Sequence, residues 1–232
     1  MGLTGVIFSI STFFYVYAFE TAGTVSAAIA FQTYPLFSIV MEFILFKKKK
    51  RLTELSFTLI MIVGIYFLGT GGTWLITGFS PWFALALIVP FLWSIAHVTI
   101  KNTLDTSPIT PNQVTFFRVL ISSIILFGIS SLASGTRNVL EGFMNQNFQI
   151  FGFLMGIIYY LELINWFYAV KHVDVSVASS ITTPAPVITM VFALFILKES
   201  IELYQIIGMI IVFVSLYGLL WSGRVKHNKK GV

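Results

Sequence analysis

Long apolar runs interrupted by proline are the feature that most constrains this chain. The run 175–197 is long enough to cross a bilayer, yet Pro184 and Pro186 stand at its middle. Each proline lacks an N–H group and clashes with the carbonyl four residues earlier, so the carbonyls of Ser180 and Thr182 lose their helical partners. In hydrocarbon such oxygens need a protein donor or a water-filled cavity, which makes this broken helix a candidate binding element.

The composition is that of an integral membrane protein. Hydrophobic residues make up 57% of the sequence and charged residues 10%, which excludes a single large water-soluble core. The net charge of +5 does not indicate nucleic-acid binding, because the lysines collect beside apolar runs. The absence of cysteine excludes disulfides and thiolate metal sites. The first twenty residues lack the basic region and the cleavage site of a signal peptide.

Eight apolar runs are expected to form transmembrane helices. Two of them have clear starts, because Ser80-Pro81 and Thr110-Pro111 each place a capping hydroxyl before a proline at the first helical position. The expected helices are 3–19, 24–46, 55–69, 81–100, 111–132, 148–170, 175–197 and 203–222.

The chain also contains an internal repeat with an offset of 151 positions. The run 24–46 carries a proline near its middle, as the run 175–197 does. The offset relates Tyr17-Ala18 to Tyr168-Ala169, Pro35 to Pro186 and Lys47 to Lys198 without a gap. The first three helices therefore correspond to the last three.

The helices 81–100 and 111–132 have no counterpart in the first half, so a complete first copy would add two helices before residue 1. When a unit with an odd number of helices is repeated, its two copies have opposite orientations in the membrane, as in the inverted repeats of secondary transporters. The expected fold class is all-α: a polytopic membrane protein of about eight transmembrane helices, an inverted repeat of a five-helix unit whose first copy is truncated.

Lysine and arginine in the short loops predict the orientation. If the run 47–51 faces the cytoplasm, eleven basic residues lie on that side and only Arg137 and Lys198 on the other. Both termini are then predicted to be cytoplasmic, in a cell membrane that we expect to be the bacterial inner membrane. The cytoplasmic set is Lys47, Lys48, Lys49, Lys50, Arg51, Lys101, Lys171, Arg224, Lys226, Lys229 and Lys230.

Several short motifs are similar to the repeated unit of EamA-type transporters in the drug/metabolite transporter superfamily. The second copy has Ser176-Val177-Ala178-Ser179, Pro186-Val187, Leu197-Lys198-Glu199-Ser200 and Gln205-Ile206-Ile207-Gly208, and the first has Tyr34-Pro35-Leu36-Phe37, Leu52-Thr53 and Gly64-Ile65. The first copy departs from the pattern where Lys47-Lys48-Lys49-Lys50 replaces the usual Gly-Glu, and where Phe57 aligns with Gly208. In return, Gly64 aligns with Ser215.

The resemblance implies a ten-helix inverted repeat that moves small metabolites, often outward. We expect residues 1–72 to be the last three helices of the first repeat, 80–223 the second repeat, and 224–232 a basic cytoplasmic tail. The expected partners are a small-molecule solute and the lipid bilayer, without nucleic acid, cofactor or metal, and a homodimer stays open.

Two charged residues within apolar runs are candidates for the site. An arginine or aspartate at the middle of a membrane helix costs roughly 2.5–3.5 kcal/mol on insertion scales. Arg118 and Glu162 lie at similar depth on neighbouring antiparallel helices, so we expect an ion pair, or a shared anionic or protonated substrate; a purely structural pair is the alternative. Asn165 shares the face of Glu162 with Tyr159 and Trp166, which suits a cavity wall or plain interhelical hydrogen bonding.

Polar residues beside the two central prolines are the remaining candidates for solute binding. Hydroxyl and amide groups next to freed carbonyls can coordinate a polar solute, whereas the alternative is that they only satisfy the kinks and let the helices pack closely. The candidates are Gln32, Thr33 and Pro35 in the first copy and Ser179, Thr182, Thr183 and Pro186 in the second.

Proton coupling has two candidates, Glu162 and His97. His97 lies one turn before the end of its helix, so it could instead reach the membrane interface near Lys101. Glu42 is expected to pair with the lysine run that follows it.

The function that these features favour is transport, and more specifically export, of a small organic metabolite by alternating access around a central cavity. A truncated, non-transporting membrane subunit or gene remnant is the alternative. An intramembrane enzyme is less favoured, because the sequence contains no His-Glu-x-x-His motif, no Gly-x-Ser-x-Gly motif and no paired intramembrane aspartates, so no catalytic residue is assigned.

Overall fold

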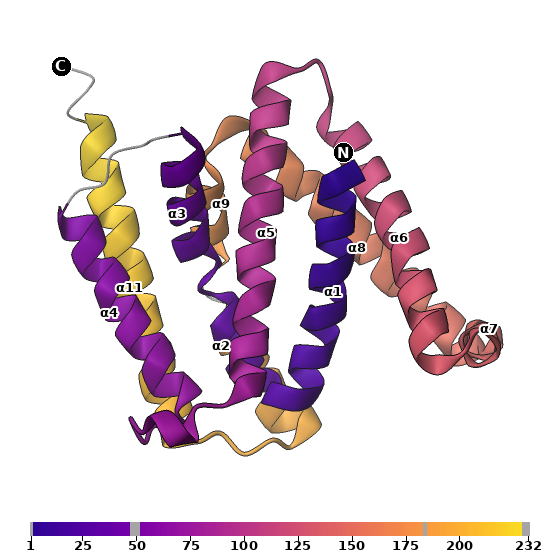
Figure 1. Ribbon diagram of the computed structural model, residues 1–232, viewed down its shortest axis with the longest axis horizontal. Coiled ribbons are helices and arrows are strands. Elements are labelled where there is room, and N and C mark those ends of the chain that lie inside the picture. Colours follow the sequence, from indigo (N-terminus) through magenta and orange to yellow (C-terminus); the bar gives the residue numbers. More distant parts are fainter. Residues whose placement is uncertain (1, 47–51, 183–184, 229–232) are drawn as a thin grey trace. The chain divides into compact units, whose positions relative to one another are not determined.

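The computed structural model describes residues 2–46, 52–182 and 185–228, and all regular structure in these residues is helical (Figure 1). The lysine run 47–51 and Thr183 lie outside the described residues. The elements in chain order are α1 (Gly2–Ala22), α2 (Thr24–Phe31), α3 (Tyr34–Phe46), α4 (Leu52–Gly69), η1 (Ile76–Gly78), α5 (Pro81–Thr106), α6 (Pro111–Ser134), α7 (Thr136–Met144), α8 (Gln146–His172), α9 (Val175–Ile181), α10 (Ala185–Phe192), η2 (Ala193–Leu197) and α11 (Leu203–Asn228).

The expected all-α, polytopic class is confirmed. Among the described residues, five helical segments are long and apolar enough to cross a membrane, and three shorter apolar helices lie at Ser56–Gly69, Ala185–Leu197 and Leu203–Leu219. The two predicted helix starts also hold, since α5 begins at Pro81 and α6 at Pro111. At the second start, Thr110 and Gln113 form a capping box, in which each side chain bonds to the other's backbone N–H.

One helix was not expected from the sequence. α7 lies between α6 and α8 and carries an ion pair of 2.8 Å between Arg137 Nε and Glu141 Oε1. Its polar residues resemble a loop, whereas the spacing of four between its opposite charges and between its apolar residues favours a helix. α7 is amphipathic and too short to span a bilayer.

Both expected breaks are present, and they divide each affected helix into two. α2 ends at Phe31 and α3 starts at Tyr34, with Pro35 in its first turn. α9 ends at Ile181 and α10 starts at Ala185, with Pro186 in its first turn. The starts of α2 and α9, of α3 and α10, and of α4 and α11 each lie 151 positions apart, which is the offset of the sequence repeat.

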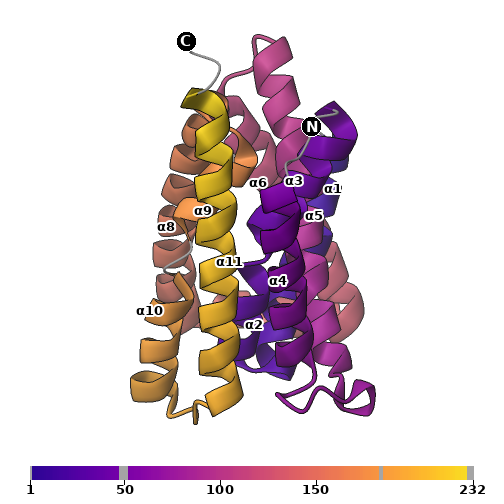
Figure 2. The same cartoon turned by 90° about the vertical axis from the view of Figure 1, so that its left-hand side faces the viewer.

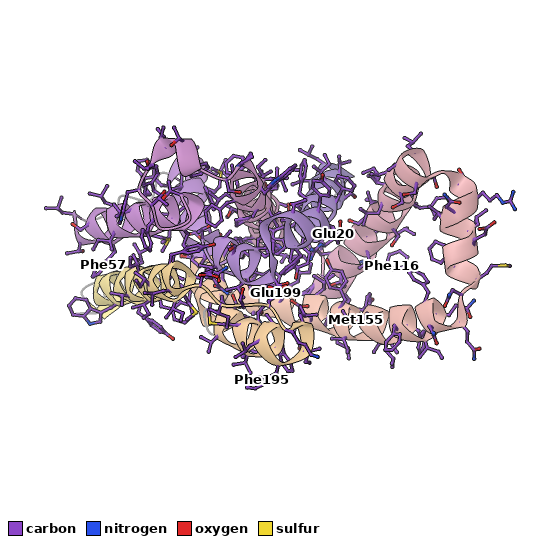
Figure 3. The ribbon with its side chains drawn as sticks, turned by 90° about the horizontal axis from the view of Figure 1, so that it is seen from below. Glu20, Phe57, Phe116, Met155, Phe195 and Glu199 are labelled. Carbon is purple, nitrogen blue, oxygen red and sulfur yellow. The ribbon has the colours of Figure 1, made fainter. Side chains whose placement is uncertain are left out.

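The chain forms two compact units. The α6–α8 unit comprises Met1–Phe13 and Thr99–Asp174, and the broken-helix unit comprises Phe14–Val98 and Val175–Val232. The broken-helix unit holds the main apolar core, which is built around α2, where every residue from Val25 to Phe31 is buried. Large apolar side chains on other helices remain exposed, as expected of a surface that meets lipid; Phe116, Met155 and Phe195 in Figure 3 are examples.

Within the broken-helix unit, α4 and α11 pack against each other through glycines. A Cβ atom added at Gly208 would lie 2.3 Å from Leu68 Cγ, and one added at Gly218 would lie 2.2 Å from Phe57 Cε1. On α4, a Cβ at Gly64 would lie 2.6 Å from Ile211 Cγ2. Small residues of this kind allow close helix approach in membranes, where apolar burial drives association little.

We expect Gly208→Val to destabilise the α4–α11 contact. The new side chain must displace the buried Leu68, and overpacking of this kind costs about 1–3 kcal/mol. The measurement is the apparent Tm in detergent. Gly156→Ala in α8 is the matched control, because no atom lies within 4 Å of the added Cβ. Equal losses in both variants would contradict this role of the glycine.

Candidate functional site

The two helix breaks meet in the broken-helix unit through Gln32. This side chain is 7% exposed and lies in the α2–α3 break. Its Nε2 donates a hydrogen bond of 2.8 Å to the carbonyl of Thr182 in the α9–α10 break. That carbonyl is the one from which Pro186 removes a helical donor; it accepts a bond of 2.9 Å from Ala185 N as well, so Gln32 is its second donor.

The halves of the broken helices pack crosswise. α3 packs against α9, and α2 packs against α10. Figure 2 shows α3 and α9 at one end of the broken-helix unit and α2 and α10 at the other. The breaks, with the buried Pro35 and Pro186, therefore lie where the crossing helices change partners.

The hydroxyl groups beside the breaks bond within their own helices. Thr33 Oγ1 donates to Ala30 O at 2.7 Å, and Thr182 Oγ1 donates to Ser179 O at 2.7 Å. These bonds fit the interpretation that Ser and Thr satisfy the kinks. The amide of Gln32 is thus the side chain that joins the two breaks.

His97 lies in a buried polar and aromatic group on α5. Its Nδ1 is 2.6 Å from the hydroxyl of Tyr34, which begins α3. Ser38 Oγ lies 3.3 Å from Ser94 Oγ one turn earlier on α5, and the ring of Trp93 meets that of Tyr34 edge-on. His97 is 6% exposed, so its ring lies within the protein beside Tyr34.

Two glutamates form contacts that sequence reasoning missed. Glu42, on α3, accepts hydrogen bonds from Ser176 N at 3.1 Å and from Ser176 Oγ at 2.9 Å. Glu199, just after η2, accepts one from Thr24 Oγ1 at the start of α2. The expected pairing of Glu42 with the lysine run falls outside the described residues, and the rule that an intramembrane carboxylate indicates function would have singled out Glu42.

Arg118 lies in an aromatic surround within the α6–α8 unit. Its Cζ is 3.7 Å from the centre of the Phe8 ring, and its Nη2 donates to Tyr159 Oη at 3.1 Å. The Phe167 ring lies 5.7 Å away, and the arginine is 6% exposed. Cation–π contacts of this kind stabilise a desolvated guanidinium by up to about 2 kcal/mol each.

The expected ion pair between Arg118 and Glu162 is not formed. Glu162 is exposed on α8, whereas the arginine turns toward Phe8 and Tyr159. Asn165 is also exposed, and its Nδ2 bonds to the Leu161 carbonyl of its own helix at 2.9 Å. Similar depth on two antiparallel helices was therefore insufficient, because the rotation of α8 decides which face meets α6.

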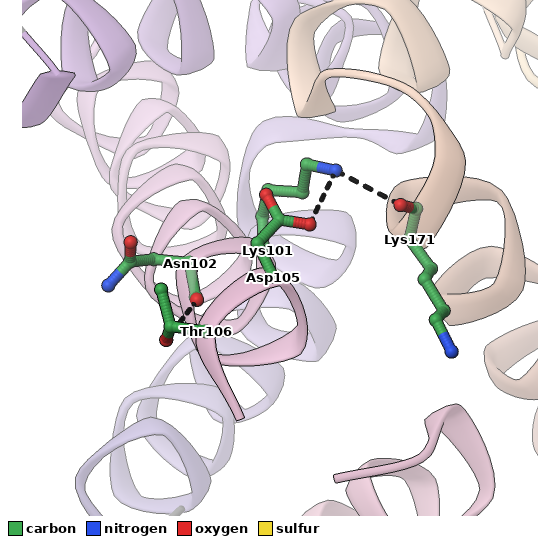
Figure 4. A network of polar contacts seen from close by, with 5 residues as sticks. All are labelled: Lys101, Asn102, Asp105, Thr106 and Lys171. Carbon is green, nitrogen blue, oxygen red and sulfur yellow. Dashed lines mark hydrogen bonds and ion pairs between the residues drawn. The ribbon is translucent and has the colours of Figure 1, made fainter. Parts of the chain in front are cut away.

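A lysine joins α5 to α8 at their C-terminal ends in the α6–α8 unit (Figure 4). Lys101 Nζ lies 3.0 Å from Asp105 Oδ1 and donates to the Lys171 carbonyl at 3.1 Å. The cation thereby satisfies a carbonyl in the last turn of α8. Among the described residues, no group of three or more His, Asp or Glu side chains could hold a metal ion.

The family follows from comparison with known proteins. The model of the EamA-like transporter family matches residues 80–221, more than half of the chain. The chain belongs to the EamA-like transporter family. It is therefore a membrane transporter in the general sense of that family.

Relatives and a solved structure agree with this assignment. An uncharacterized transporter of Clostridium kluyveri is 23% identical over 223 residues, which cover 92% of this EamA-like chain and 68% of the relative. An uncharacterized transporter of Buchnera aphidicola is 28% identical over 137 residues, or 59% of this chain and 43% of the relative. A protein of known crystal structure has the same fold, with a TM-score of 0.58 and 16% identity, over 96% of this chain and 76% of its own.

We expect Tyr159→Phe to destabilise the α6–α8 unit, because it removes the hydrogen bond from Arg118. Bonds to a charged group contribute about 1.5–3 kcal/mol. The apparent Tm of the purified protein measures the loss. Glu162→Gln, on the same helix, is the control and should leave the Tm unchanged. A drop in Tm with Glu162→Gln as large as that with Tyr159→Phe would contradict this expectation and would indicate that Arg118 pairs with Glu162.

Proposed function

We propose that this EamA-like protein exports a small organic metabolite by alternating access, with the solute bound beside the two helix breaks. The observation that carries the proposal is the hydrogen bond between Gln32 and the Thr182 carbonyl, because it joins a side-chain amide of one helix break to the backbone of the other. Broken helices supply solute ligands in other transporters through the same chemistry, because their unwound backbone is polar.

The proposed solute contacts come from both breaks. Gln32 can exchange its bond to Thr182 for a bond to a solute, since an amide both donates and accepts. Pro35 and Pro186 lack an N–H group, so each removes one helical donor and adds to this polar surface, and Thr183, outside the described residues, is proposed from its place in the sequence. Arg118 and Asn165 are proposed as solute contacts within the α6–α8 unit by itself, where the guanidinium would suit an anionic group and the amide a polar one.

The proposed cellular setting follows the distribution of basic residues. We place the protein in a cell membrane, the bacterial inner membrane, with both termini in the cytoplasm. The solute is then taken from the cytoplasmic side. The alternative of a non-transporting subunit predicts that the chain by itself moves nothing, and a homodimer remains compatible with either function.

The test of transport uses proteoliposomes loaded with a mixture of amino acids, organic acids and nucleosides. Mass spectrometry of the external medium identifies any component that leaves these proteoliposomes faster than it leaves loaded vesicles without protein. We expect Gln32→Leu to reduce the flux about tenfold, because it removes the amide that bonds to the Thr182 carbonyl and would bond to the solute, a contribution of about 1.5 kcal/mol. Gln146→Leu, at the exposed start of α8, is the matched control.

Two outcomes would count against this proposal. A flux in Gln32→Leu equal to that of the unsubstituted protein would show that the helix breaks do not form the solute site. An absence of flux for every component in the unsubstituted protein would favour the non-transporting subunit.

For proton coupling, we propose His97 in preference to Glu162, since His97 contacts a broken helix through Tyr34. An imposed proton gradient should accelerate flux in the unsubstituted protein and have no effect in His97→Gln. Tyr34→Phe keeps the imidazole and should keep a weakened response. A response abolished by Glu162→Gln instead would move the role to that carboxylate.

A further inference from the structure

Two glutamates, one in or beside each broken helix, bond to the start of the other broken helix. Glu42, near the end of α3, bonds to the first turn of α9 through the backbone and side chain of Ser176. Glu199, after η2, bonds to the hydroxyl of Thr24, the first residue of α2. The α9 contact and the α2 contact lie at opposite ends of the broken-helix unit (Figure 2).

Glu42 is 3% exposed, and burial of a carboxylate at this level is costly without hydrogen bonds. The start of α9 offsets that cost, because the first turn of a helix carries N–H groups without intrahelical partners and a partial positive charge. The two bonds from Ser176 therefore stabilise the buried carboxylate of Glu42. The separation of α3 from α9 must break both of them.

Glu199 is brought to α2 by an unusual local backbone. The five residues of η2 form a π-helical turn, and Lys198 then adopts a left-handed conformation with φ 55°. This conformation is rare for residues other than glycine, and π-helical turns are frequent at functional sites. Next to it, Gln205 Nε2 donates to Ser26 Oγ at 2.9 Å, so α2 is held by two polar contacts at this end.

The two contacts are not copies of each other within the repeat. At the offset of 151, Glu42 aligns with Ala193 and Glu199 aligns with Lys48. Each end of the broken-helix unit therefore has a carboxylate of its own. Since α3 packs on α9 and α2 on α10, each carboxylate spans only one of the two packed ends.

We propose that Glu42 and Glu199 are positioning residues of the transport cycle, each of which keeps one end of the broken-helix unit closed. The inference rests on the proposed alternating access, in which one end must open while the other stays shut. Loss of the Glu42 contact loosens α9 from α3, and loss of the Glu199 contact removes one of the two polar contacts that hold α2 to the chain after η2. A purely structural role predicts instead that either loss loosens the whole unit.

Cysteine labelling distinguishes these two roles, since the chain has no native cysteine. Ala27→Cys on α2 and Ala178→Cys on α9 are matched reporters, because both alanines are buried and they lie 151 positions apart. Each reporter is combined with Glu42→Gln or Glu199→Gln in nanodiscs, where both membrane faces are open to a water-soluble maleimide. Glutamine keeps the size of glutamate and removes the charge that strengthens its hydrogen bonds.

We expect Glu42→Gln to raise the labelling rate of Ala178→Cys about tenfold and to leave that of Ala27→Cys unchanged. Glu199→Gln should do the reverse. Glu20→Gln and Glu202→Gln, at exposed positions, are the control substitutions and should change neither rate. Equal acceleration of both reporters by either variant, or no acceleration in any variant, would overturn the proposal.

The experiment needs no substrate, so its outcome is separate from that of the transport assay. End-specific labelling without flux would keep the closing role of the glutamates and remove the proposed export. Flux without end-specific labelling would keep export and remove the role of the glutamates. Should one glutamine variant fail to fold, Thr24→Val removes the hydroxyl donor to Glu199, and Ser176→Ala removes the hydroxyl donor to Glu42 but keeps the backbone N–H donor. The same pattern is expected, with a smaller effect of Ser176→Ala.

Discussion

Backbone groups inside hydrocarbon must find partners within the protein, and this constraint shapes the broken-helix unit. Prolines interrupt two membrane helices, and each interruption leaves carbonyl groups that lipid cannot satisfy. The bond from Gln32 to the Thr182 carbonyl joins the two interruptions. A polar point of this kind is costly to bury unless a solute, or the opposite break, completes its hydrogen bonds.

Close packing elsewhere in the same unit supports this polar centre. The α4–α11 contact relies on glycines opposite Leu68, Ile211 and Phe57, and it brings the two copies of the repeat together through small against large residues. The sequence repeat aligns Phe57 with Gly208, so the copies have diverged in side-chain size while the helix starts kept their offset. Repeated backbone with unequal side chains gives the two ends of the unit different polar contacts.

Buried charge is handled in two ways in this protein. Arg118 is surrounded by aromatic rings and bonds to a tyrosine hydroxyl. Glu42 is held by the start of a helix. Ring faces and a hydroxyl thus stabilise the cation, and donors in the first turn of a helix stabilise the carboxylate.

The sequence by itself determined the class, the helices and the breaks. Apolar length, capping hydroxyls before Pro81 and Pro111, and the prolines at positions 35 and 186 act locally, so they can be read without tertiary structure. It did not reveal α7, whose polar residues resemble a loop. Only the tertiary structure decided that Gln32 meets Thr182, that Glu42 meets Ser176, and that Arg118 turns away from Glu162. These contacts depend on the rotation and crossing of helices far apart in the chain, and a shared depth in the membrane does not specify them.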